Sequence, residues 1–247
     1  MNIFLFLFLF LSTIRNTIQH QDPFSITAHY LNKSIENKEA IFTVKCLNKS
    51  KSMSNVQITV SQEDKIRCQF IGIFGDFNYL KGPSFKQKVA PILPPLDECI
   101  DAGSIIKKAF GDKLKIQNTF ELMIPKSDPF NILALSKKIG TTASISGYVR
   151  FNDNRPHCFR SLSFFCDALP PPILNIHPTS WVPTLEFTTH FWKLPHKTEN
   201  NWIRFKFDVD YMENGLLYES GQLWDYSGEI LLATSRQIAR ILVVSSK

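Results

Sequence analysis

Two similar segments, 161 residues apart, constrain the fold more strongly than any other feature of the sequence. The segment "SITAHYL" resembles "EFTTHFW", and aligning them places Thr27 over Thr188 and His29 over His190. The stretches that follow also correspond, because "SIENKEAIFTVKCL" and "HKTENNWIRFKFDV" both lead from a polar Glu-Asn turn into alternating apolar residues. Self-similarity at a fixed offset indicates that one structural unit occurs twice in the chain.

Each copy continues with two more stretches that have the pattern of strands. They are "MSNVQITVSQ" and "KIRCQFIGIFG" in the first copy, and "GLLYESGQLWD" and "EILLATSRQIARILVV" in the second. The order Leu217, Glu219, Gly221, Leu223 illustrates the two-residue period of half-buried antiparallel strands. Each repeat is therefore predicted to contain a meander of four long strands.

The second copy has extra material before its meander. "ASISGYVRF" is typical of a strand, and "RSLSFFCDAL" of a short apolar helix that ends at Pro170, because proline cannot continue a helix. The first copy should have a matching helix, and its only candidate is the opening "MNIFLFLFLFLSTIR". We expect a first repeat over 1–76 without its N-terminal strand, a linker with partial strand structure near "NTFELMI" over 77–138, and a second repeat over 139–247.

The opening run has a competing interpretation as a secretory signal. Signal peptides carry a cation before the apolar stretch, whereas the first cation here is Arg15, after it. The apolar block from Ile3 to Leu11 is also too short to span a bilayer, which takes about 18–20 residues. We favour a buried helix. Removal of residues 1–20 from the mature protein would favour a secreted or membrane-tethered binding module instead.

Charge and cysteine content narrow the classes of partner. The chain has a formal charge of +6, but its lysines are scattered and no nucleic-acid-binding motif accompanies them, so we expect no nucleic-acid partner. The five cysteines are odd in number and lack the CxxC spacing of a zinc or redox site. They are predicted to be small buried residues in a reducing compartment.

Specific motifs resemble the acyl-CoA thioesterase II (TesB-like) family over nearly the whole chain. They are "FFCDALPPPIL", "WVPTLEFTTHF", "ENGLLYESGQLWDYSGEILLATSRQIAR", "DPFSITAHYLNKS" and "PPLDEC". The resemblance implies an α+β double hot-dog fold, in which two helix-wrapped antiparallel sheets occur in one chain. It also implies hydrolysis of acyl-CoA to a fatty acid and free CoA, with no cofactor and no metal.

The resemblance further implies an intracellular enzyme, cytoplasmic or peroxisomal, with acyl-CoA as its partner and no membrane association. Assembly into a homo-oligomer stays open. Carried over by motif, the catalytic residues are Asp167 in "FFCDALPP", Thr184 in "VPTLEF" and Gln237 in "ATSRQIA". A carboxylate can take a proton from water while a hydroxyl and an amide orient that water. Backbone N–H groups near Ser161, at the start of the helix, are candidates for stabilising the oxyanion.

Each of these residues also has a simpler interpretation. Asp167 could be an ordinary polar residue at a helix end, and a register slip would replace Thr184 by Thr188 or Thr189. His29 and His190 recur in both repeats beside bulky apolar residues, which favours packing over catalysis.

Two rival functions stay open at the level of the whole chain. The first is a non-catalytic acyl-binding or assembly protein that keeps the double hot-dog fold. The second is a hydratase of the same fold, which is disfavoured because no His-Asp pair has hydratase-like spacing on the helix of either repeat. The missing first strand also leaves the activity itself open.

Overall fold

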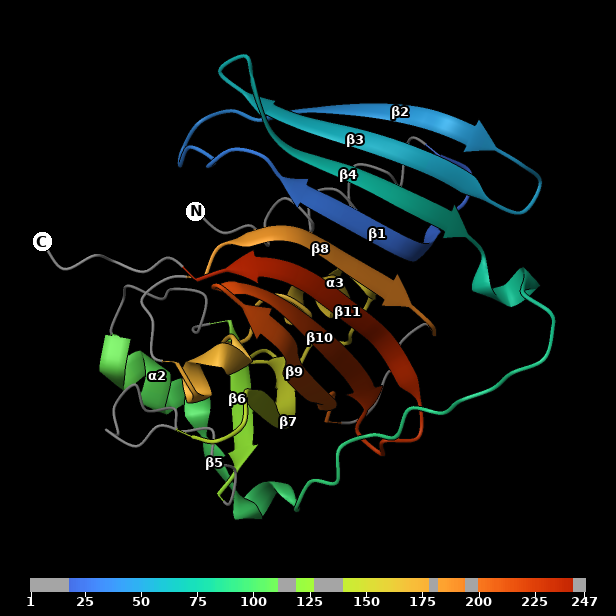
Figure 1. Cartoon of the computed structure of the whole chain (residues 1–247). Coiled ribbons are helices and arrows are strands. Elements are labelled where there is room, and N and C mark those ends of the chain that lie inside the picture. The colour runs from blue at the N-terminus through green and yellow to red at the C-terminus, as the bar shows by residue number, and fades with distance from the viewer. Residues whose placement is uncertain (1–17, 111–118, 127–139, 178–181, 194–199, 242–247) are drawn as a thin grey trace, which may run out of the picture.

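The strands of the computed structural model form one antiparallel sheet (Figure 1). The structure describes residues 18–110, 119–126, 140–177, 182–193 and 200–241. The opening apolar run, with the helix predicted for it, lies outside these residues. The strands are β1 (Asp22–Tyr30), β2 (Ile41–Lys49), β3 (Ser54–Gln62), β4 (Lys65–Gly75), β5 (Cys99–Asp101), β6 (Phe120–Pro125), β7 (Ser144–Phe151), β8 (Thr184–Phe191), β9 (Ile203–Glu213), β10 (Leu216–Asp225) and β11 (Leu231–Arg240). Their order in the sheet is β2-β3-β4-β1-β8-β11-β10-β9-β7-β6-β5.

The antiparallel pair β1–β8 joins the N-terminal strands of the sheet to its C-terminal strands. Thr27 lies directly opposite Thr188, and their hydroxyl oxygens are 2.9 Å apart in a hydrogen bond. Outward from this pair the order is β4, β3, β2 on one side and β11, β10, β9 on the other. The two threonines that the sequence aligns therefore meet where the N-terminal strands join the C-terminal strands.

Helix α3 (Phe159–Phe165) packs against one face of this sheet, behind β8 and β11 in Figure 1. Its buried Leu162 and Phe165 join a core that contains inward-facing residues of both β1–β4 and β7–β11. The helix begins at a capping box between Cys158 and Ser161. It ends before Pro170, because a residue that precedes proline disfavours helical geometry.

Residues 77–138 contribute structure next to β7. A short helix, α2 (Ala102–Phe110), follows β5, and β6 pairs with β7. Gly147 of β7 permits this approach, because a Cβ there would lie 2.2 Å from the carbonyl oxygen of Met123 on β6. The domain limits at 76 and 138 stay a prediction.

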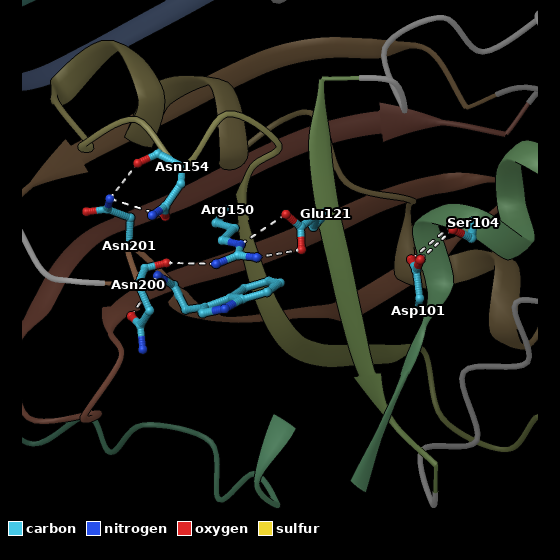
Figure 2. Close-up of polar contacts among 8 residues, drawn as sticks. Asp101, Ser104, Glu121, Arg150, Asn154, Asn200 and Asn201 are labelled. Atoms are coloured by element: carbon cyan, nitrogen blue, oxygen red, sulfur yellow. Dashed lines mark hydrogen bonds and ion pairs between the residues drawn. The ribbon is translucent and has the colours of Figure 1, made fainter. Parts of the chain in front are cut away.

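A polar network joins β6 to β7 and to the residues that precede β9 (Figure 2). The Arg150 guanidinium on β7 donates two hydrogen bonds, of 3.1 and 2.9 Å, to the carboxylate of Glu121 on β6. It also lies over the Trp202 ring at 4.4 Å and donates to the carbonyl of Asn200. A bidentate guanidinium–carboxylate pair fixes geometry more strictly than a single contact does.

Strand β2 forms one edge of the sheet and is mostly exposed. Among the described residues its only strand partner is β3. A register irregularity between Cys46 and Asn48, together with Lys45 and Lys49, is typical of edges that resist pairing with other chains. No helix in the described part of the chain is long and apolar enough to cross a membrane.

Candidate active site

Thr184 and Gln237 meet on neighbouring strands. Thr184 is the first residue of β8, and its hydroxyl donates a 2.9 Å hydrogen bond to the side-chain Oε1 of Gln237 on β11. The ladder between these strands shifts register between Ile238 and Ala239, so Thr184 pairs with Ala239. The shift lets the end of β8 face the Gln237 amide. The structure thus brings together two of the three residues expected from the sequence.

Asp167 lies two residues beyond the end of α3, where the chain leaves the helix. Its backbone N–H donates to the Phe164 carbonyl at 3.2 Å, while its side-chain Oδ2 is buried without a hydrogen-bond partner. Burial raises the pKa of this carboxyl to about 7. In the described residues it makes no direct hydrogen bond to Thr184 or Gln237. Its link to them runs through a residue that the sequence analysis did not select.

That residue is Glu219 on β10, which lies directly opposite Gln237 in the ladder between β10 and β11. The two side chains lie on the same face of the sheet, where the Gln237 amide lowers the pKa of Glu219 and the charge of Asp167 raises it. Glu219 is 6% exposed and its Oε2 has no partner. The pKa of Glu219 is raised to about 8. Burial is the main cause and the charge of Asp167 adds to it, whereas the Gln237 side chain lowers the pKa.

Tyr30, the last residue of β1, brings the other half of the sheet to the same place. Its hydroxyl is buried without a hydrogen-bond partner. Burial and then the nearby charge of Asp167 raise its pKa well above the ordinary value. The charge of Asp167 therefore acts on Tyr30 from one half of the sheet and on Glu219 from the other.

Cys166 and Ser161 are close to Asp167 in sequence, but neither side chain is available for catalysis. Burial raises the pKa of the Cys166 thiol to about 12, so the thiolate that a nucleophile requires does not form near neutral pH. The Ser161 hydroxyl donates to the Cys158 carbonyl and accepts from its N–H within the helix cap. The expectation of oxyanion donors near Ser161 stays untested.

The two histidines that recur in the sequence lie on the opposite face of the sheet. Side chains alternate along β8, so His190 faces away from the buried Thr189. The His190 ring stacks on Trp192 with centroids 6.2 Å apart, and His29 is exposed at its place opposite Glu186. Neither histidine shares a face with Gln237. No group of His, Cys, Asp or Glu in the described residues is arranged to hold a metal ion.

An antiparallel sheet packed on a central helix, with a buried carboxyl where the helix ends, defines a protein of the hot-dog fold. An Alicyclobacillus acidocaldarius protein of that fold matches with a TM-score of 0.71 and 18% identity, over 90% of this chain and 79% of its own. A tesB protein of Mycobacterium avium subspecies paratuberculosis gives 0.76 and 14%, covering 98% and 88%. A Thermobifida fusca protein provisionally named thioesterase II gives 0.75 and 22%, covering 95% and 85%.

The family is shown by the sequence itself. The model of the acyl-CoA thioesterase C-terminal domain family matches residues 108–241, which is more than half of the chain. The chain belongs to this family and is a thioester hydrolase. A search of curated proteins found no significant match. The resemblance to TesB-like thioesterases that the sequence motifs indicated is confirmed.

Proposed function

We propose that this protein hydrolyses acyl-CoA to a fatty acid and free CoA, with a water molecule positioned by Asp167, Thr184 and Gln237. The observation that carries the proposal is the Thr184–Gln237 hydrogen bond, together with the buried Asp167 carboxyl, whose Oδ2 lacks a partner. A hydroxyl and an amide held in fixed geometry can orient water, and an acceptor-only carboxylate can take its proton. Family membership supplies the class of reaction.

The reaction then needs one base and no covalent intermediate. Water attacks the thioester carbonyl carbon while the Asp167 carboxylate takes one of its protons. The C–S bond of the tetrahedral intermediate breaks, and the departing CoA sulfur takes the proton back from Asp167. The products are the fatty acid and CoA. A base whose pKa is about 7 suits this shuttle, because it both accepts and returns a proton near neutral pH.

We also propose that the chain is a double hot-dog, whose first repeat has no N-terminal strand among the residues that the structure describes. The matching strand order on the two sides of β1–β8 supports the duplication, as does the facing of Thr27 and Thr188. The position of β2 at the sheet edge supports the missing strand, because its counterpart β9 has β7 as a further neighbour. The second repeat, which holds Asp167, Thr184 and Gln237, has its own helix and strand.

We place the enzyme inside the cell, in the cytoplasm or peroxisomes. All five cysteines are unpaired, and Cys68, Cys99 and Cys166 are buried. Free buried thiols are typical of proteins from reducing compartments. The resemblance to TesB-like thioesterases, whose substrate is acyl-CoA, implies the same location.

Release of free thiol from acyl-CoA tests the enzymatic proposal. Purified protein is assayed over short to long acyl chains, after its exposed Cys46 and Cys158 have been allowed to react fully with the thiol reagent. We expect Asp167→Asn to lose at least about 100-fold in kcat, because it removes the base. Gln237→Ala and Thr184→Val should lose about 10- to 100-fold, because they release the water from its geometry.

Two variants outside the site serve as controls. Asp153 is an exposed carboxylate with a side chain 56% exposed, so Asp153→Asn should leave kcat unchanged. Gln57→Ala removes an amide from β3, which β4, β1 and β8 separate from the Gln237 strand β11 in the sheet. No thiol release by folded wild-type protein would favour the rival, a non-catalytic acyl-binding protein. Release that persists in Asp167→Asn would refute the assigned base.

A further inference from the structure

We propose that Glu219 is a positioning residue, whose carboxyl group holds the side-chain amide of Gln237 in the orientation that the reaction needs. The inference rests on the proposed function for the role of Gln237. It concerns a residue that strand alternation alone would assign to the apolar core. Glu219 itself takes no proton from the substrate water and touches no reacting atom.

The two residues are placed for this contact by the backbone. Glu219 and Gln237 are direct partners in the β10–β11 ladder, so their side chains emerge on the same face of the sheet. Thr184 donates to the Gln237 Oε1 at 2.9 Å. This leaves the Nε2–H groups of the amide to donate toward the carboxyl of Glu219, its partner in the ladder.

Only one of these two contacts can decide which way the amide faces. A hydroxyl such as that of Thr184 donates or accepts, so it would accept from Nε2 if the amide turned over. When Glu219 is ionised, above its pKa of about 8, its carboxylate accepts only and would repel Oε1. The ionised form of Glu219 thus selects the orientation in which Thr184 bonds Oε1. The second N–H of the Gln237 amide then stays available for the water or the thioester oxygen.

No cation among the described contacts stabilises the charge of the Glu219 carboxyl. The charged groups that act on it are Asp167 beyond α3 and Asp208 and Asp210 on β9, all of the same sign. Lys206 pairs with Asp208 at 3.2 Å rather than with Glu219. A buried carboxyl without a cationic partner destabilises a fold, and an apolar residue of similar volume is often better tolerated. Retaining an acid here is consistent with a role in the site.

Kinetics of Glu219→Met and Glu219→Gln test the proposal. Methionine keeps the volume and removes the acceptor, so kcat should fall about 10- to 100-fold with little change in KM. Glutamine keeps an acceptor but can also donate, so the amide is less strictly oriented and kcat should fall only a few-fold. Glu213→Met at the exposed end of β9 is the matched control and should retain full activity.

Two kinetic outcomes would overturn the inference. The first is a folded Glu219→Met variant whose kcat is within twofold of the wild type. The second is an equal loss in Glu219→Gln and Glu219→Met, which would mean that the negative charge matters rather than the oriented amide.

A second measurement does not depend on turnover. The side-chain NH2 signals of Gln237, assigned with Gln237→Ala, should shift with pH as the neighbouring carboxyl ionises. Substituting Asp167→Asn in the background removes the other nearby titrating carboxyl. The shift should persist in that variant and vanish in Glu219→Gln. A signal that titrates equally in Glu219→Gln, or not at all in either, refutes the contact even if wild-type protein proves inactive and the proposed function fails.

Discussion

Asp167 and Glu219 share an environment that favours their neutral forms. Both are buried side chains whose unpartnered oxygens lie close enough to interact, and neither has a cation beside it among the described contacts. Two carboxyls in such a place cannot both be charged without a large loss of free energy. The pair therefore titrates near neutral pH rather than near pH 4. The two titrations are therefore coupled, and their apparent pKa values belong to the pair rather than to either residue.

This titration makes the stability of the fold depend on pH. Both carboxyls have folded-state pKa values raised from about 4 in the unfolded chain to about 7 and about 8. Each contributes stability that is fully present below pH 4 and is lost as the pH rises through the folded value. We expect the free energy of unfolding to fall by a few kcal/mol between pH 5 and pH 8, measured by urea denaturation.

The matched variant is Asp167→Asn combined with Glu219→Gln. It cannot ionise at either position, so this part of the pH dependence should disappear, and the variant should exceed the wild type in stability at pH 8. A double variant that loses stability with pH as steeply as the wild type would contradict the assignment of the effect to these two residues.

Sequence motifs identified part of the site, and physical reasons explain what they missed. Thr184 and Gln237 lie in recognisable motifs, and their contact follows from the pairing of β8 with β11. Glu219 had a visible signal, because it occupies an inward position between Leu217 and Gly221 in an alternating strand. Tyr30 had none. It reaches Asp167 only because β1 pairs with β8, a contact between residues far apart in the chain.

At the level of elements, strands were easier to predict than helices. The stretches of alternating apolar residues in the repeats are β1–β4 and β8–β11, as expected from their two-residue period. The helix predicted over "RSLSFFCDAL" is confirmed but ends at Phe165, earlier than its apolar composition suggested. The local sequence of β5 does not predict it, because the strand is only three residues long and such short strands depend on their neighbours rather than on a local pattern.

The turns of two hairpins differ in how well their residues suit the backbone. Asn214 and Gly215, between β9 and β10, have positive φ angles of 50° and 80°, which this residue pair adopts readily. Glu63 and Asp64, between β3 and β4, adopt positive φ angles of 50° and 55°, where glutamate in particular is strained.

Replacing Glu63-Asp64 by Asn-Gly should therefore stabilise the fold by about 1 kcal/mol, because the strain is relieved without changing the turn. Thermal unfolding measures the effect, and Glu63 also pairs with Lys38 at 3.1 Å on the surface. Lys38→Met is the control, since a surface ion pair contributes little. A lower melting temperature in the Asn-Gly variant would show that Glu63 and Asp64 stabilise this turn by other means.

At the scale of the molecule, the two halves share one sheet and one core. The apolar core contains Phe70 of β4 together with Phe187 of β8 and Phe205 of β9. The β1–β8 pair continues the hydrogen-bond ladder from one half to the other. A substitution in the core of one half should therefore also lower the stability of the other half.

Phe70→Ala tests this coupling, because all four tryptophans lie after residue 180, in the C-terminal half. Loss of a fully buried phenylalanine should lower stability by about 3–5 kcal/mol. We expect the tryptophan fluorescence melt and the far-UV circular dichroism melt to shift together to lower temperature. Ile71→Ala, at a neighbouring side chain that is 49% exposed, should shift both only slightly. A fluorescence melt that stays in place in Phe70→Ala would mean that the halves unfold independently.

The neutral carboxyls at the site also change the electrostatic field of the whole molecule. The formal charge of +6 counts Asp167 and Glu219 as ionised, so at pH 7 the protein carries more positive charge than its composition states. Near its isoelectric point of about 9.0 both groups are largely ionised, and the excess is gone. A positive field accelerates the approach of anions. The polyanionic CoA moiety of the proposed substrate would thus be attracted most strongly on the acid side of neutrality, where the base Asp167 is least ionised.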